Sequence, residues 1–232
     1  MPGMPIVFIP GLMTTCRIYQ HEIEDLGQRH PVLLANHWSA PTMREIATQI
    51  LAVAPERFAL AGTSMGGYAA LEIIRQAPNR VTSLALLSTS AKPDTPEKSK
   101  GRREQVAAAR KAGNMRAGTK ALFPKLVHPA RHEDHPLLTT FIEMAEHLGV
   151  DAFDRQIEAI ISREDARSLL STIKIPTLVV VGKDDTLIPP DEGREIAAGI
   201  DGAKIEEIEN AGHMCMIERP EAVTSALVKF FG

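Results

Sequence analysis

Short apolar runs alternate with stretches of helical periodicity over much of the chain. The runs predict buried strands at residues 5–9, 31–35, 58–61, 82–87, 176–182 and 204–208. Helical spacing follows most of these strands, at residues 18–28, 42–54, 69–75, 191–200 and 220–231. Strands that alternate with helices predict an α/β fold, with a mostly parallel sheet of about six strands and helices on both faces.

The strand signal disappears between residues 91 and 168. Helical spacing in this part of the chain predicts about four helices, at residues 97–112, 117–127, 136–148 and 151–161. We therefore divide the chain into an α/β core, residues 1–90 and 169–232, and a helical cap insertion, residues 91–168. The insertion should lie over the carboxyl ends of the strands, where open α/β sheets place their ligands.

Composition narrows the class of protein. The 232 residues are 44% hydrophobic and 24% charged, as in globular proteins, and the net charge of −3 does not favour nucleic acid as a partner. No basic segment precedes an apolar run at the N-terminus, and no apolar stretch approaches the roughly 20 residues of a membrane span. Two cysteines, Cys16 and Cys215, do not make a disulfide framework, so we expect a cytoplasmic protein with free thiols. Nothing in the sequence specifies an oligomeric state.

One motif lies between a predicted strand and a predicted helix. Residues 62–66, Gly-Thr-Ser-Met-Gly, fit G-x-S-x-G, and a strand–turn–helix context is typical of a nucleophile elbow. The residues two before and two after the serine approach each other in such a turn, so both must be small. Ser64 would then stand at the start of a helix, where unpaired amides favour negative charge. The alternative is a Gly/Ser turn that caps an ordinary helix.

A serine hydroxyl needs a base beside it, and the base needs a carboxylate that fixes its tautomer. Candidates for both roles follow strands. Asp184 and Asp185 follow the strand at residues 176–182, and His213 follows the strand at 204–208. Either aspartate could instead cap a local turn, and His213 could be an ordinary loop histidine.

Acyl transfer also needs donors for the developing oxyanion, which are usually backbone amides. Met65, directly after the serine, can supply one donor, and Leu12, after Pro10-Gly11 in the first strand's exit loop, can supply the second. Gly11 as a plain turn residue is the alternative. We find no zinc-type spacing and no phosphate-binding glycine loop, so we expect neither metal nor cofactor.

Three stretches together resemble a known family: residues 62–67, Gly182-x-x-Asp185-x-x-x-Pro189, and Gly212-His213. They resemble the α/β-hydrolase superfamily, and in particular small bacterial carboxylesterase-like members similar to enol-lactonases and pimeloyl-carrier methyl ester esterases. The resemblance implies the α/β-hydrolase fold and a triad of Ser64, His213 and Asp185. It selects Asp185 because the acid of the family stands three residues after the glycine. It also implies Leu12 and Met65 as oxyanion donors.

The chain departs from that family in three places. Many relatives carry His-Gly where this chain has Pro10-Gly11, which changes the packing of the loop. Residues 36–41 replace a charged, glycine-rich loop, and we expect the fold without the N-terminal hairpin that is common in the family. His37 and Trp38 in that loop could line the substrate pocket, or Trp38 could simply pack.

The resemblance implies a serine hydrolase that cleaves a small ester, thioester or lactone through an acyl-enzyme. Carbon–carbon bond hydrolysis or acyl transfer with the same triad is one alternative, and a binding protein on the same fold is another. Trp38, Phe123 and Met144 are the candidate substrate-binding residues. Residues 92–131 carry eleven basic and three acidic side chains, an excess that suits an anionic or carrier-bound acyl substrate. A solvated helical face is the other interpretation.

Overall fold

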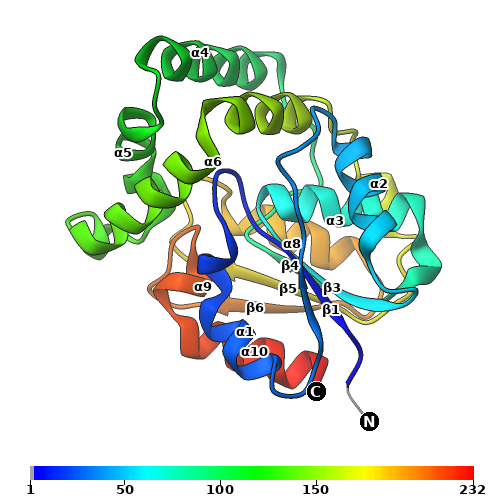
Figure 1. Cartoon of the computed structure of the whole chain (residues 1–232). Helices are drawn as coiled ribbons and strands as arrows, with labels where there is room; N and C mark the ends of the chain where they lie inside the picture. The colour runs from blue at the N-terminus through cyan, green and yellow to red at the C-terminus, as the bar shows by residue number, and fades with distance from the viewer. Residues whose placement is uncertain (1–2) are drawn as a thin grey trace.

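Six parallel strands form one sheet in the order β2-β1-β3-β4-β5-β6 (Figure 1). The computed structural model describes residues 3–232. The strands are β1 Ile6–Ile9, β2 Val32–Leu34, β3 Phe58–Thr63, β4 Val81–Leu87, β5 Thr177–Gly182 and β6 Lys204–Ile208. Helices cover the sheet, so the α/β class with about six strands is confirmed.

Alternate residues of the strands face opposite layers of helix. Val7 and Ile9 belong to one buried cluster, which is completed by α2 Met43–Val53, α3 Met65–Gln76 and α8 Pro190–Gly199. Ile6 and Phe8 belong to a second cluster, which is completed by α1 Gln20–Leu26, α9 Cys215–Glu218 and α10 Pro220–Phe231. Because both faces are covered, the inner strands need apolar residues at nearly every position, as the sequence shows.

A block of helices connects β4 to β5. It contains α4 Pro96–Ala112, α5 Arg116–Leu126 and α6 His135–Ile161, and we call residues 96–161 the α4–α6 block. Figure 1 shows these helices in the upper part of the view, with the strands between them and the helices α1 and α10 at the bottom. Gly149, with φ 78° and ψ 172°, breaks α6 into the two helices that the sequence predicted there. The short helices η3 Pro129–Arg131 and α7 Arg167–Leu170 complete the connection.

Some boundaries differ from the prediction. The first helix begins as a 3-10 turn, η1 Cys16–Tyr19, because the Thr15 hydroxyl accepts a hydrogen bond from the Arg17 amide. Four further short elements, α7, α9, η3 and η2 Pro78–Arg80, were not predicted, because a single turn carries no periodicity. In the part of the chain that the structure describes, no helix is long and apolar enough to cross a membrane. Cys16 is exposed, Cys215 is buried, and neither forms a disulfide.

Candidate active site

Ser64 stands at the turn between β3 and α3 with a strained backbone. Its φ of 53° and ψ of −114° lie in the left-handed half of conformational space, which a non-glycine residue rarely adopts. The turn is tight: a Cβ atom on Gly62 would collide with the Gly66 carbonyl, and one on Gly66 would collide with the Ile9 carbonyl. The Ser64 amide donates to the Leu87 carbonyl at 2.9 Å, which holds the turn against β4.

His213 and Asp185 form a buried pair. Asp185 Oδ2 lies 2.7 Å from His213 Nδ1, and the two side chains are 0% and 1% exposed. Asp185 Oδ1 accepts hydrogen bonds from the amides of Leu187, at 2.8 Å, and Ile188, at 2.9 Å. Since a carboxylate only accepts, the imidazole proton lies on Nδ1, and Nε2 is left as an acceptor.

Asp184 lies apart from this pair. Its side chain is 45% exposed, and its Oδ2 is 3.6 Å from Nε2 of His128. The structure therefore brings Asp185, and not Asp184, into contact with His213.

The loops that carry the three candidate residues leave the same edge of the sheet, since all the strands are parallel. The exit loops of β5 and β6 touch, because a Cβ atom on Gly182 would collide with the Gly212 carbonyl. Ser88, after β4, lies 3.8 Å from the thiol of Cys215, two residues beyond His213. Among the hydrogen bonds of residues 3–232, none joins Ser64 Oγ to His213 Nε2. The two residues lie in loops at the same edge of the sheet.

The β1 exit loop lies directly beside Ser64. A Cβ atom on Gly11 would sit 3.5 Å from Ser64 Cβ. Leu12 follows in this loop, and Met65 is the first residue of α3, so its amide has no partner inside the helix. Both predicted oxyanion donors thus belong to segments that flank the serine.

Two side chains hold this loop in place through hydrogen bonds, and the sequence analysis predicted this role for neither of them. His37 Nε2 lies 2.8 Å from the Gly11 carbonyl, and Gln156 Oε1 accepts a hydrogen bond from the Met13 amide at 3.1 Å. Both side chains are 0% exposed. Burial lowers the pKa of His37 from 6.5 to about 4, so the ring is neutral at physiological pH.

The α4–α6 block also touches the loop between β6 and α9, residues 209–214, which carries His213 and which we call the histidine loop. The Glu218 carboxylate accepts hydrogen bonds from the Gly212 amide, at 2.8 Å, and from the His128 amide, at 2.6 Å. The Met214 amide donates to the Leu126 carbonyl at 2.9 Å. Burial raises the pKa of Glu218, which the two amide donors oppose. The position of His213 is thereby tied to the end of α5.

The three predicted substrate-binding residues lie in two places. Trp38 is half-buried beside His37, with ring centroids 5.3 Å apart, and its carbonyl accepts a hydrogen bond from Arg155. Phe123 and Met144 are both 1% exposed in the cluster between α5, α6 and the sheet. Met144 Sδ lies 3.4 Å from the Thr15 amide, just beyond the β1 exit loop. Their contact with a substrate stays a prediction.

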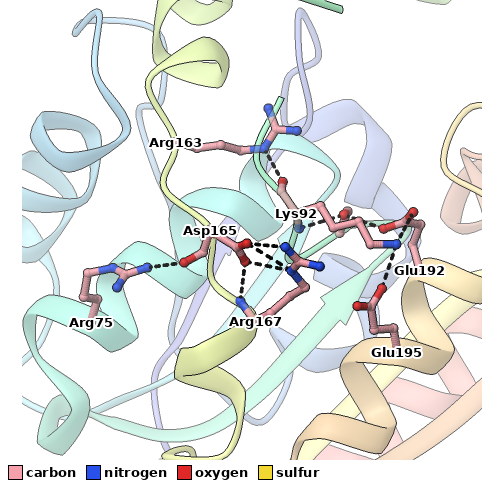
Figure 2. Close-up of polar contacts among 8 residues, drawn as sticks. Arg75, Lys92, Arg163, Asp165, Arg167, Glu192 and Glu195 are labelled. Carbon is pink, nitrogen blue, oxygen red and sulfur yellow. Dashed lines mark hydrogen bonds and ion pairs between the residues drawn. The ribbon is translucent and has the colours of Figure 1, made fainter. Parts of the chain in front are cut away.

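Ion pairs and hydrogen bonds fasten the segments that flank the α4–α6 block to the core (Figure 2). Lys92 pairs with Glu192 at 2.9 Å and with Glu195 at 2.7 Å, both on α8. Arg163 donates to the Lys92 carbonyl, and Arg75 of α3 donates to the Asp165 carbonyl. These contacts join α3 and α8 to the segments directly before and after the block.

Several basic residues of the block face carboxylates. Arg102 pairs with the buried Asp94 at 2.8 Å, Arg103 pairs with Glu158 at 2.9 Å, and Arg110 contacts both Asp151 and Asp154. The excess positive charge in residues 92–131 is therefore partly neutralised by carboxylates from the second half of α6. Within residues 3–232, no group of three or more His, Cys, Asp or Glu side chains is arranged to hold a metal ion.

Known proteins resemble the chain over nearly its whole length. The chain is 27% identical over 220 residues to the pimeloyl-acyl-carrier protein methyl ester esterase of Neisseria meningitidis, covering 88% of this chain and 84% of that protein. A thermophilic esterase from Thermogutta terrifontis superposes with a TM-score of 0.88 at 26% identity, covering 98% of this chain and 89% of the other. The enol-lactonase of Burkholderia xenovorans gives 0.85 at 26% identity, covering 98% and 91%. Residues 6–226 match the model of the Alpha/beta hydrolase family, and the chain therefore belongs to that family.

Proposed function

We propose that the protein is a serine hydrolase that cleaves a small carboxylic ester, thioester or lactone through an acyl-enzyme. The observation that carries this proposal is the buried contact between His213 and Asp185 at the edge of the sheet where the strained Ser64 turn also lies. In this arrangement His213 Nε2 is an acceptor, as a general base requires.

The reaction would run in two halves. His213 Nε2 takes the Ser64 proton as Oγ attacks the carbonyl carbon, and the amides of Leu12 and Met65 stabilise the oxyanion. Asp185 stabilises the imidazolium, which then protonates the leaving alkoxide or thiolate as its bond to the carbonyl carbon breaks. His213 next takes a proton from water as the water oxygen attacks the acyl carbon. The bond from that carbon to Ser64 Oγ then breaks, and the imidazolium returns the proton to Oγ, which releases the acid and restores Ser64.

We further propose that residues 91–168 act as a cap over this site. The contacts of the α4–α6 block with the β1 exit loop and with the histidine loop support this role. Trp38, Phe123 and Met144 would line the pocket at the junction of cap and core. Lysines of the cap would favour an anionic or carrier-bound acyl group, and the pimeloyl-acyl-carrier protein methyl ester esterase is a relative named for such a substrate. Two free cysteines suit the cytoplasm as its location.

The same three residues could hydrolyse a carbon–carbon bond in a β-diketone or transfer the acyl group to an acceptor other than water. We favour ester hydrolysis because the esterase and the enol-lactonase resemble this protein over nearly its whole length. A binding protein would need no His213–Asp185 pair.

The test is covalent labelling by a fluorophosphonate probe, with turnover of short and medium p-nitrophenyl esters and of a β-diketone. Wild-type protein and Ser88→Ala, which removes a neighbouring buried hydroxyl, should be labelled, and Ser64→Ala should not. Turnover of the diketone alone would favour the carbon–carbon alternative. Folded wild-type protein that neither labels nor turns over would favour the binding protein.

A further inference from the structure

The Gly11 carbonyl is the most heavily bonded group of the β1 exit loop. It accepts hydrogen bonds from His37 Nε2 at 2.8 Å, from the Thr14 amide at 3.2 Å and from Thr14 Oγ1 at 3.0 Å. The Leu12 amide belongs to the same peptide unit. In a trans peptide the carbonyl and the following N–H point in opposite directions, so bonds that fix the Gly11 oxygen also fix the direction of the Leu12 N–H.

His37 reaches this carbonyl from the exit loop of β2. Burial lowers the pKa of His37 and keeps the ring neutral. Since a carbonyl only accepts, the single ring proton of this neutral imidazole lies on Nε2. The contact joins two loops that are 26 residues apart in the chain. It gives the loop after Pro10 an anchor from outside its own segment.

Gln156 holds the other side of Leu12. Its Oε1 accepts from the Met13 amide, and because an amide N–H can only donate, the orientation of the side-chain amide is determined. Met13 has a φ of 53°, a conformation that the Cβ atom of a non-glycine residue disfavours and that the surrounding contacts must maintain. Arg155, the preceding residue of α6, donates to the Trp38 carbonyl at 2.9 Å, so one turn of α6 contacts both exit loops.

The Gln156 Nε2 group is buried and makes no hydrogen bond within residues 3–232. A glutamine at this buried position lowers the stability of the fold, because its Nε2 group loses water without gaining a hydrogen bond. An apolar residue of the same volume would fill the site without that cost but could not accept the Met13 amide. The position thus favours the acceptor function over packing.

We propose that His37 and Gln156 are positioning residues that aim the Leu12 amide at the oxyanion beside Ser64. Gln156 belongs to α6, so docking of the α4–α6 block completes the oxyanion hole as well as covering it. This inference rests on the proposed function for the role of Leu12. The contacts of Gly11 and Met13 are independent of that role.

Two matched pairs of variants test the proposal. His37→Phe keeps a ring but removes the donor, whereas His37→Gln retains an N–H near the position of Nε2. Gln156→Met keeps the volume and removes the acceptor. Ile157→Val removes a methyl group from the neighbouring buried residue of α6 and leaves the Gln156 hydrogen bond to Met13 in place. Melting temperature and circular dichroism establish that each variant is folded. Amide exchange at Met13 and Thr14 is measured by NMR, alongside kcat and KM for an ester.

We expect His37→Phe and Gln156→Met to lower kcat by on the order of 10- to 100-fold with KM changed less than about threefold. The Leu12 amide stabilises the oxyanion of the transition state, so its displacement slows the reaction but affects substrate binding little. Exchange at Met13 should accelerate at least about tenfold in Gln156→Met, while His37→Gln and Ile157→Val stay within about threefold of wild type. Equal kcat values in Gln156→Met and Ile157→Val, or in both His37 variants, would overturn the proposal. If wild type turns over no ester, the proposed function fails, and unchanged exchange at Met13 and Thr14 would then overturn the positioning contacts separately.

Discussion

Asp185 Oδ2 lies 2.7 Å from His213 Nδ1, and both side chains are removed from water. Asp185→Asn would replace the accepting carboxylate by an amide that cannot stabilise an imidazolium. We expect kcat to fall by on the order of 10³- to 10⁴-fold with little change in KM. Kinetics on p-nitrophenyl acetate would measure it.

Asp184→Asn is the matched control, because it makes the same change one residue earlier on an exposed side chain. We expect its kcat to stay within about threefold of wild type. Equal losses in the two variants would mean that the Asp185–His213 contact has no special part in the reaction.

Much of this site follows from local chemistry, which a single sequence displays. Gly62 and Gly66 are required by close approach within the turn itself, and His213 and Asp185 each leave a strand at the same edge of a parallel sheet. The inner strands could be predicted because burial on both faces demands apolar residues. The choice between Asp184 and Asp185 needed the family resemblance, because both follow the same strand and differ only in the direction of the side chain.

Contacts between distant segments could not be predicted. Gln156 and Met13 are 143 residues apart, and a glutamine within a helix carries no local sign that its partner is a strained loop. Glu218 is similar, because one carboxylate there satisfies amides from two different segments. The partial neutralisation of the basic excess in residues 92–131 could not be predicted either, since the carboxylates of Asp151, Asp154 and Glu158 lie beyond that stretch.

Replacement of glycine by alanine should have opposite effects on stability at Gly66 and at Gly101. Gly66→Ala would drive a methyl group into the Ile9 and Pro10 carbonyls, and we expect a loss of several kcal/mol or failure to fold. Gly101 lies inside α4 with open space around it, so Gly101→Ala should stabilise by roughly 0.5–1 kcal/mol. Urea unfolding measures both. A stable Gly66→Ala would show that the turn is looser than its contacts indicate.

Glu22 predicts how stability depends on pH. Its carboxyl group is buried on α1 near Thr224, and neither oxygen has a hydrogen-bond partner within residues 3–232. Burial raises its pKa from 4.5 to about 8. The folded state therefore retains a proton that the unfolded chain releases, so the contribution of Glu22 to stability is full below pH 4.5 and is lost as pH rises to about 8.

Between pH 5 and pH 8.5 we expect this group to lower the free energy of unfolding by roughly 2–4 kcal/mol. Glu22→Gln should remove that part of the pH dependence, whereas Glu24→Gln, on the exposed side of α1, should leave it intact. Urea unfolding of the three proteins across this pH range is the measurement. Parallel curves for wild type and Glu22→Gln would mean that the carboxyl group is ionised in the folded protein.

The lysines of the α4–α6 block predict a charge preference for the substrate. Arg102 and Arg103 already pair with Asp94 and Glu158, so reversing them would break structural contacts. Lys120 and Lys125 of α5 are exposed, and the ion pairs of residues 3–232 do not include them.

The double variant Lys120→Glu/Lys125→Glu should raise KM for an ester with a free carboxylate by roughly threefold to tenfold at low salt, and should leave KM for a neutral ester of equal length unaffected. The difference should vanish at about 0.5 M salt, because screening removes the attraction. Equal KM changes for both esters would instead identify these lysines as a solvated surface.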